Sequence, residues 1–186
     1  HQAKPRLSAD DLYTGVEFQK QLSACQKLLD GHTYVISAGA GLIEVTSSKT
    51  IPSYEATFIG GNGPTYSTWP LLPEGGLENL SIQEGDQVVS FAPPQYHRAL
   101  AEDPLFSEIA PKLVVASTSP LAPLAGTVIN VHPRSREALG VASKSLNTQF
   151  LQIYLIEGVK GMQWIYNRAT KLGPPQIRRR VDDAEL

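Results

Sequence analysis

Apolar and polar positions follow two patterns along the chain, and together these patterns predict an α/β fold. Four short apolar runs bounded by turn residues are expected to be strands: Tyr34–Ala38, Gln87–Ala92, Leu113–Ser117 and Thr127–Val131. Because helical patterns separate these runs, we expect the strands to pair in parallel with helices on both faces. The pattern therefore predicts a three-layer α/β sandwich around a mainly parallel sheet of four to five strands.

Helices are expected where apolar residues recur every three or four positions. The longest such stretches are Asp10–Leu29 and Leu146–Leu172, and we expect the second to break near Gly158 or Gly161. Shorter helices are expected over Pro93–Leu100, Pro104–Ala110 and Ser135–Val141. Residues 44–83 are rich in Gly, Pro, Ser and Thr without strong periodicity, which is more typical of a functional loop system than of scaffold.

A chain of 186 residues is long enough for one well-buried core and too short for two comfortable ones. We expect one α/β domain over residues 1–172 and a mobile tail over 173–186, in which three arginines precede three acidic residues. The apolar runs are far shorter than a membrane-spanning helix, and no signal-peptide pattern opens the chain. We therefore expect a cytoplasmic protein without a membrane partner.

Residue types that hold metals or cofactors are scarce in the sequence. Cys25 is the only cysteine, which excludes an intrachain disulfide and a cysteine-rich zinc site. The four histidines lack metal-ligand spacing, and the glycine-rich turn at 39–41 has neither dinucleotide-binding spacing nor a P-loop lysine. We therefore expect no metal and no other cofactor. Ser37, Ser117 and Ser119 lack the elbow motif of a serine hydrolase.

Charge changes this picture through its distribution, since the net charge is only −2. Residues 1–125 carry seven basic and thirteen acidic side chains, whereas residues 126–181 carry nine basic and two acidic ones. Such asymmetry indicates one basic face, for which phosphate is the commonest partner. The alternative explanation is a set of solvated helix surfaces.

In a parallel α/β sheet, ligands bind beyond the carboxyl ends of the strands. In the expected sheet these ends are the segments Ser37–Gly41, Ala92–Tyr96, Ser117–Ser119 and Asn130–Arg136. Glycines after a strand let a backbone approach a phosphate or a ring closely. We therefore expect the substrate-binding residues to include Ser37, Gly39, Gly41 and Asn130.

Three motifs in the first sixty residues occur in a familiar order: Leu12-Tyr-Thr-Gly15, Ile36-Ser-Ala-Gly-Ala-Gly-Leu-Ile43 and Ile51-Pro-Ser-Tyr-Glu-Ala-Thr57. In this order they resemble the YaaA-like proteins and a related bacterial and phage-associated family. The resemblance continues loosely through Gly85-Asp86 and Tyr96. It implies a uracil-DNA-glycosylase-like fold and DNA as the partner. The family usually begins with a strand and a Cys-x-x-Lys turn; the strand is absent here, although Lys4 can be the lysine of the turn, and no catalytic residue of that strand is assigned.

A second motif begins within the last expected strand and continues past its end: Val128-Ile-Asn-Val-His-Pro-Arg-Ser135. It resembles the His-Pro-Ser-Pro motif of uracil-DNA glycosylases, with Arg134 in place of the family's serine. The resemblance implies that His132 stabilises the departing base and that the following loop contacts the DNA backbone. We expect the backbone contacts to come from Arg134, Ser135, Arg136 and Lys144, because phosphate contacts come mainly from such side chains.

Cleavage of an N-glycosidic bond builds positive charge on the sugar and negative charge on the departing base. A carboxylate assists the first and positions water, and a histidine or backbone N–H assists the second. Glu55 is the best-placed carboxylate and His132 the best-placed donor, so these two are the expected catalytic residues. The aromatic residues expected to stack on an extruded base are Tyr13, Tyr54 and Tyr96.

Structural explanations compete with these assignments. Glu55 can cap a turn or pair with a lysine, the tyrosines can be packing aromatics, and His97 is expected to be a surface or core residue. We predict a DNA glycosylase-like enzyme that acts on a modified base, such as a phage-type base, in anti-phage defence. The alternatives are a non-catalytic DNA-binding stress protein of YaaA type and a base-exchange or nucleotide-processing enzyme.

Overall fold

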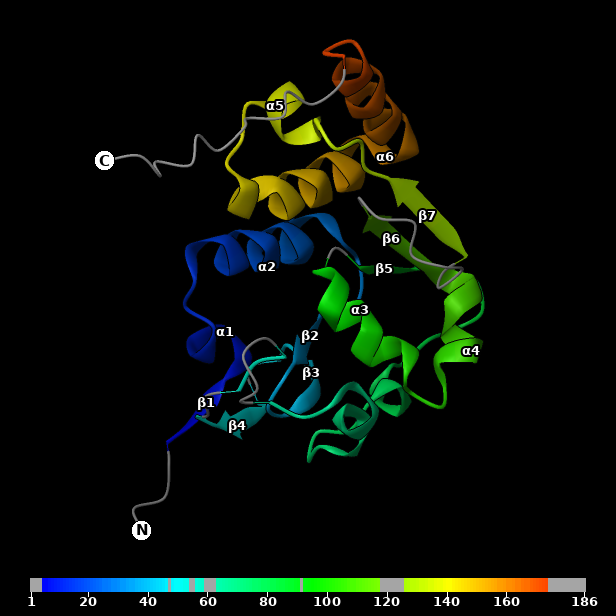
Figure 1. Cartoon of the computed structure of the whole chain (residues 1–186). Coiled ribbons are helices and arrows are strands. Elements are labelled where there is room, and N and C mark those ends of the chain that lie inside the picture. Colours follow the sequence, from blue (N-terminus) through cyan, green and yellow to red (C-terminus); the bar gives the residue numbers. More distant parts are fainter. Residues whose placement is uncertain are drawn as a thin grey trace, which may run out of the picture.

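The computed structural model describes residues 5–46, 48–53, 56–58, 63–90, 92–117 and 126–173. The tail expected at 173–186 lies outside these residues except for Gly173. The strands form three sheets (Figure 1). Two are antiparallel pairs, β1 (Arg6–Ser8) with β4 (Thr50–Pro52) and β2 (Tyr34–Ser37) with β3 (Gly41–Glu44). The third is parallel, in the order β5 (Val88–Ser90), β6 (Leu113–Ser117), β7 (Thr127–Asn130).

The parallel sheet confirms three of the four expected strands. Its central strand is β6, in which Val114 and Val115 are almost completely buried. Val115 pairs with Ser90 on one side and with Val128 on the other. A central parallel strand is covered on both faces, which is why it appears in the sequence as a continuous apolar run.

The first expected strand is wrong as a member of this sheet. Tyr34–Ala38 contains β2, which turns back after Ser37 and pairs antiparallel with β3. No helix lies between β2 and β3, so these two strands lack the crossover connection that parallel pairing needs. Among the described residues the parallel sheet therefore has three strands in place of the expected four to five.

The helix expected over Asp10–Leu29 is two helices, α1 (Ala9–Leu12) and α2 (Val16–Leu28). The chain leaves the helical conformation between them, and Gly15 then precedes α2 in an extended conformation. The Gln19 side chain donates hydrogen bonds to the carbonyl oxygens of Asp10 and Tyr13, both at 2.8 Å. These bonds close the gap between the two helices and place Tyr13 in it.

The other expected helices are confirmed, α3 shifted by one residue and the rest with shorter bounds. They are α3 (Pro94–Ala101), α4 (Phe106–Ile109), α5 (Ser135–Leu139) and α6 (Leu146–Thr170). The break expected in the last of these lies at Gly158, whose φ of 62° and ψ of −150° are not helical. Figure 1 shows the two halves of α6 running in different directions. Short 3-10 helices are η1 (Tyr66–Leu71), η2 (Leu77–Asn79), η3 (Ala110–Lys112) and η4 (Ser143–Ser145).

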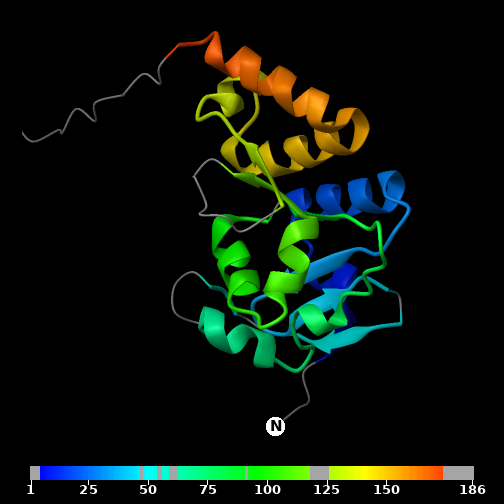
Figure 2. The same cartoon turned by 90° about the vertical axis from the view of Figure 1, so that its right-hand side faces the viewer.

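Of the three hydrophobic clusters among the described residues, two involve the helices beside the parallel sheet. One joins the parallel sheet to α6 through Val114, Ile129, Val131, Phe150, Leu151, Met162 and Ile165. The other joins β3, the 3-10 helices and α3 through Leu42, Trp69, Leu77, Ala99 and Leu100. Figure 2 shows α6 on one side of the parallel sheet and α3 and α4 on the other. The described residues thus form a mixed α/β structure with helices on both sides of a parallel sheet.

Residues 44–83 were expected to be a functional loop system, and their described part packs against the β2–β3 hairpin. Trp69 is 0% exposed, and its Nε1 donates a 2.7 Å hydrogen bond to the carbonyl oxygen of Ser37. Asp103 at the end of α3 accepts a 2.8 Å hydrogen bond from the backbone N–H of Leu77. Among the described residues, no helix has both the length and the apolar character needed to cross a membrane.

Candidate functional site

The carboxyl ends of the three parallel strands lie at one edge of the sheet. These ends are Ser90, Ser117 and Asn130, and the last two are paired in register. Two of the expected strand-end segments follow this edge, one leading into α3 and one into α5. Because ligands bind beyond this edge in parallel α/β sheets, it is the place to look for a site.

A cleft of about 320 Å³ opens at the β5 end of this edge. It lies between α2, β2 and the segment that links β5 to α3, and its lining includes Tyr13, Phe18, Cys25, Val89, Ser90 and Tyr96. Its size is at the lower end of the range for small-molecule sites, and its walls are mainly apolar with few polar groups. Such a cleft suits a small planar ring.

Two of the tyrosines expected to stack on a base, Tyr13 and Tyr96, line this cleft although they lie far apart in the sequence. Tyr13 comes from the gap between α1 and α2, and its ring packs on Phe18 with a centroid distance of 5.0 Å. Tyr96 comes from the first turn of α3, and its ring meets Phe58 edge to face at 5.1 Å. Each of the two tyrosine rings thus packs against another aromatic ring.

The polar group at the strand end of the cleft is the Ser90 hydroxyl, which is held by His97. The Nε2 atom of His97 lies 2.9 Å from the Ser90 Oγ atom, and the His97 side chain is only 3% exposed. Burial lowers the pKa of His97 to about 4, so the ring is neutral at pH 7. Of the two positions expected for His97, surface or core, the structure shows the core.

The His97 ring also determines what Ser90 can offer a ligand. Its Nδ1 atom is buried with no hydrogen-bond partner among the described residues, and a buried orphan N–H is rarer than an unused acceptor. The proton is therefore best placed on Nε2, where it donates to Ser90. The backbone N–H of Ala92 also points to the Ser90 Oγ atom, at 3.5 Å. With these two groups donating to it, the Ser90 hydroxyl has its own proton left to donate, and Ser90 lines the cleft.

His132 lies at the same edge, beyond the end of β7. The backbone N–H of Arg134 donates a 3.1 Å hydrogen bond to its Nδ1 atom, and its ring packs edge to face on Tyr166 at 5.5 Å. The bond at Nδ1 places the proton of a neutral ring on Nε2, which is the form that can donate to a departing base. One strand, β6, separates β7 from β5, so Ser90 ends one outer strand of the sheet and His132 follows the other.

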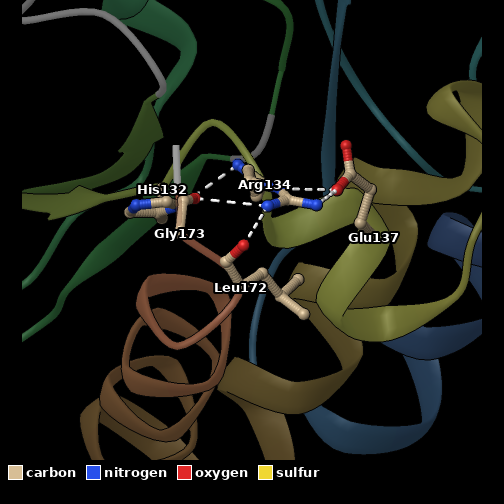
Figure 3. A network of polar contacts seen from close by, with 5 residues as sticks. All are labelled: His132, Arg134, Glu137, Leu172 and Gly173. Carbon is tan, nitrogen blue, oxygen red and sulfur yellow. Dashed lines mark hydrogen bonds and ion pairs between the residues drawn. The ribbon is translucent and has the colours of Figure 1, made fainter. Parts of the chain in front are cut away.

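The Arg134 side chain is used inside the molecule (Figure 3). Its guanidinium donates to the carbonyl oxygens of Leu172 and Gly173 and forms an ion pair with Glu137. It is 14% exposed. These contacts cap the carboxyl end of α6 and tie it to the loop that carries His132, so the geometry gives Arg134 a structural role beside the expected phosphate contact.

The other three residues expected to contact a DNA backbone differ in exposure. Ser135 is 1% exposed, so its hydroxyl does not reach a phosphate in this conformation. Arg136 and Lys144 are exposed, and Arg136 donates a 2.7 Å hydrogen bond to the Ser143 hydroxyl. Among the four residues, Arg136 and Lys144 present their charge to solvent.

The glycine-rich turn has an internal explanation. Ser37 is buried, and its hydroxyl accepts hydrogen bonds from the backbone N–H groups of Gly39 at 3.3 Å and Ala40 at 3.0 Å. Gly41 has a φ of +112°, and a side chain there would overlap the carbonyl oxygen of Gly75. The close approach that this turn allows is therefore to another segment of the same chain, away from a ligand.

Tyr54 and Glu55 lie outside the described residues, as does Ser119. The structure thus brings Tyr13 and Tyr96 together in one cleft, and it gathers His132, Arg134 and Arg136 around α5. The Ser90–His97 pair was missed by sequence reasoning. The pattern in the sequence that could have revealed this pair is a serine at the end of a strand and a histidine seven positions later on the next helix.

Among the described residues, no group of His, Cys, Asp and Glu side chains is arranged to hold a metal ion. Comparisons with protein-family models, with curated proteins and with solved structures give no match for this chain. Its function is therefore inferred from its residues and their geometry.

Proposed function

We propose that the protein is a DNA glycosylase-like enzyme that cleaves the N-glycosidic bond of a modified base, such as a phage-type base, in anti-phage defence. The observation that carries the proposal is the cleft at the carboxyl edge of the parallel sheet, walled by Tyr13 and Tyr96. Aromatic walls of this kind suit a base that has been extruded from the stack. The helices on both sides of the sheet support the further proposal of a uracil-DNA-glycosylase-like fold.

A base in the cleft would meet the Ser90 hydroxyl as a hydrogen-bond donor. This favours a base edge that carries an acceptor, such as a carbonyl oxygen or a ring nitrogen. The His97 ring behind Ser90 keeps that donor directed without adding charge, since the ring is neutral at pH 7. Ser90 is thus the residue that would select among bases of similar size.

The reaction separates charge between the sugar and the base. The electron pair of the C1′–N bond leaves with the base, and a water oxygen forms the new bond to C1′. In our proposal, Glu55 takes the proton of that water. His132 does not line the cleft in this conformation, so its Nε2–H group donates to the departing base once substrate binding brings the segment after β7 up to the cleft. The substrate would then extend along the sheet edge from the cleft toward β7, where Arg136 and Lys144 can hold flanking phosphates.

The test is incubation of the protein with DNA from phages that carry different modified bases, followed by mass spectrometry of the released bases. We expect one base to be released and an abasic site to remain in the DNA. Release of no base from DNA that the protein nevertheless binds would contradict the proposal. That result would support the alternative of a non-catalytic DNA-binding protein.

A further inference from the structure

The second half of α6 exposes an unusual set of side chains. Lys160, Trp164 and Arg168 follow one another at intervals of four residues and therefore share one face, which Lys171 extends by one more turn. All four side chains are exposed. We call these four residues the α6 basic face.

Trp164 is the centre of this face. It is 52% exposed, whereas Trp69, the other tryptophan of the chain, is completely buried. The guanidinium carbon of Arg168 lies 5.4 Å from the centroid of the Trp164 ring, which is a cation–π distance. Because Arg168 stacks on the ring and Trp164 stays exposed, the indole can stack on a partner with one ring face.

The three cations beside the indole are not neutralised by the chain. Among the described residues, Lys160, Arg168 and Lys171 take part in no ion pair. Glu157, just before the kink, is the only acidic residue of α6. The face therefore carries positive charge around an aromatic surface, which is the combination that binds single-stranded nucleic acid.

Two other partners fit this face less well. A basic helix that lies in a membrane inserts a continuous apolar face, but the apolar face of this half-helix is already buried through Met162, Ile165 and Ala169. A second copy of the chain would bring positive charge against positive charge. Only an anionic partner with flat rings satisfies both the charge and the indole.

We propose that the α6 basic face binds a single strand of nucleic acid, with a base stacked on Trp164 and phosphates held by Lys160, Arg168 and Lys171. This inference rests on the proposed function in taking nucleic acid as the partner, but it needs neither the cleft nor bond cleavage. The Arg134 contacts to Leu172 and Gly173 tie this half of α6 to the His132 loop. A bound strand is thereby placed in a fixed position relative to the site.

Tryptophan fluorescence tests the proposal, because Trp164 is the exposed one of the two indoles. Titration with a short oligothymidylate at low salt should quench the emission, and added salt should reverse the quenching. Trp164→Ala should weaken binding by roughly 5- to 150-fold, the equivalent of one stacked base, and the anisotropy of a labelled oligothymidylate measures this because the variant lacks the reporting indole. Lys160→Ala and Arg168→Ala should each lower the slope of log affinity against log salt by about 0.7.

The controls separate this inference from the proposed function. Lys27→Ala removes an exposed lysine from α2 and should leave oligothymidylate binding unchanged, and Tyr13→Ala in the cleft should leave the quenching intact. Thermal unfolding checks that each variant is folded. Unchanged affinity of Trp164→Ala would overturn the proposal. So would quenching by anionic lipid vesicles but not by the oligonucleotide, or a dimer that Trp164→Ala dissociates.

Discussion

The Ser90–His97 pair combines burial with an incomplete set of hydrogen bonds. Among the described residues, His97 has a hydrogen-bond partner at one ring nitrogen, and the cost of burying a charged ring keeps it neutral. A neutral histidine behind a hydroxyl directs that hydroxyl, and none of the acidic residues that the structure describes orients the ring for activation of a nucleophile. At the scale of single residues, this pair is therefore better suited to recognising a base edge than to covalent catalysis.

The buried histidine should make stability depend on pH. The pKa of His97 is about 4 in the folded chain and about 6.5 when unfolded. Between these values the unfolded state binds a proton that the folded state does not, so acid favours unfolding. The free energy of unfolding should fall by up to about 3 kcal/mol from pH 6.5 to pH 4. Denaturant unfolding of wild type and His97→Gln should show a smaller loss in the variant, and parallel pH curves would contradict this.

His132 should matter for the chemical step and little for DNA affinity. The bond from the Arg134 backbone to its Nδ1 atom leaves Nε2–H as its available donor. His132→Ala should slow base release by roughly 10² to 10⁴-fold, the usual range for one positioned acid–base group. DNA affinity, measured by fluorescence anisotropy, should change little because phosphate contacts dominate it. Base release at the wild-type rate in this variant would remove His132 from the mechanism.

At the scale of elements, the β2–β3 hairpin is the junction against which the segment around residues 69–75 packs. Its turn packs against residues 74–75 through hydrogen bonds of 2.8 Å from Glu74 to Ala40 and 2.9 Å from Leu42 to Gly75. Trp69 fastens the next segment to the same hairpin through Ser37. The turn expected to bind a ligand is thus a structural junction.

Substitution of two glycines, Gly41 in this junction and Gly85 outside it, separates the energetic cost of backbone strain from that of a packing clash. Gly41 and Gly85 both have positive φ, at +112° and +90°, but only at Gly41 would a Cβ meet another atom within 4 Å. Gly85→Ala should cost about 1–3 kcal/mol of strain, and Gly41→Ala should cost clearly more because Gly75 must also move. Chemical denaturation measures both. Equal losses would show that the contact with Gly75 does not constrain the hairpin.

The expected and observed elements agree where apolar periodicity alone determines the structure. The strands β5, β6 and β7, the helix α3 and the break at Gly158 all follow from local patterns. The β2 pairing does not, because a short apolar run is compatible with parallel or antiparallel neighbours and its partner β3 lies only three residues further on. The cleft brings together Tyr13 and Tyr96, and the sequence contains both rings but not the gap between α1 and α2 that positions the first.

At the scale of the whole molecule, the basic character of residues 126–173 is divided among different roles. Arg134 is used internally, whereas Arg136 and Lys144 near α5 and the α6 basic face remain exposed. The cleft belongs to the N-terminal part of the chain and the exposed cations belong to the C-terminal part. The carboxyl edge of the parallel sheet is where the two parts meet, which fits a substrate with one ring and several phosphates.

The exposed cations near α5 should contribute to DNA affinity without regard to sequence. The double substitution Arg136→Ala and Lys144→Ala should weaken binding to every duplex, and the slope of log affinity against log salt should fall by about 2 for two lost phosphate contacts. Anisotropy titrations at several salt concentrations measure this slope. Lys27→Ala on α2 is the matched control, and an unchanged slope in the double variant would move the DNA-binding surface elsewhere.

The central claim is that the cleft between Tyr13 and Tyr96 holds the base whose glycosidic bond is cleaved. Its most direct test is the single-turnover rate of base release from modified phage DNA, compared between wild type and Tyr96→Ala. Loss of one stacking wall should slow release by roughly 5- to 150-fold, the equivalent of one base–aromatic contact. Tyr96→Phe keeps the ring and should retain most of the rate. If the folded Tyr96→Ala variant releases the base at the wild-type rate, the base is not held in this cleft.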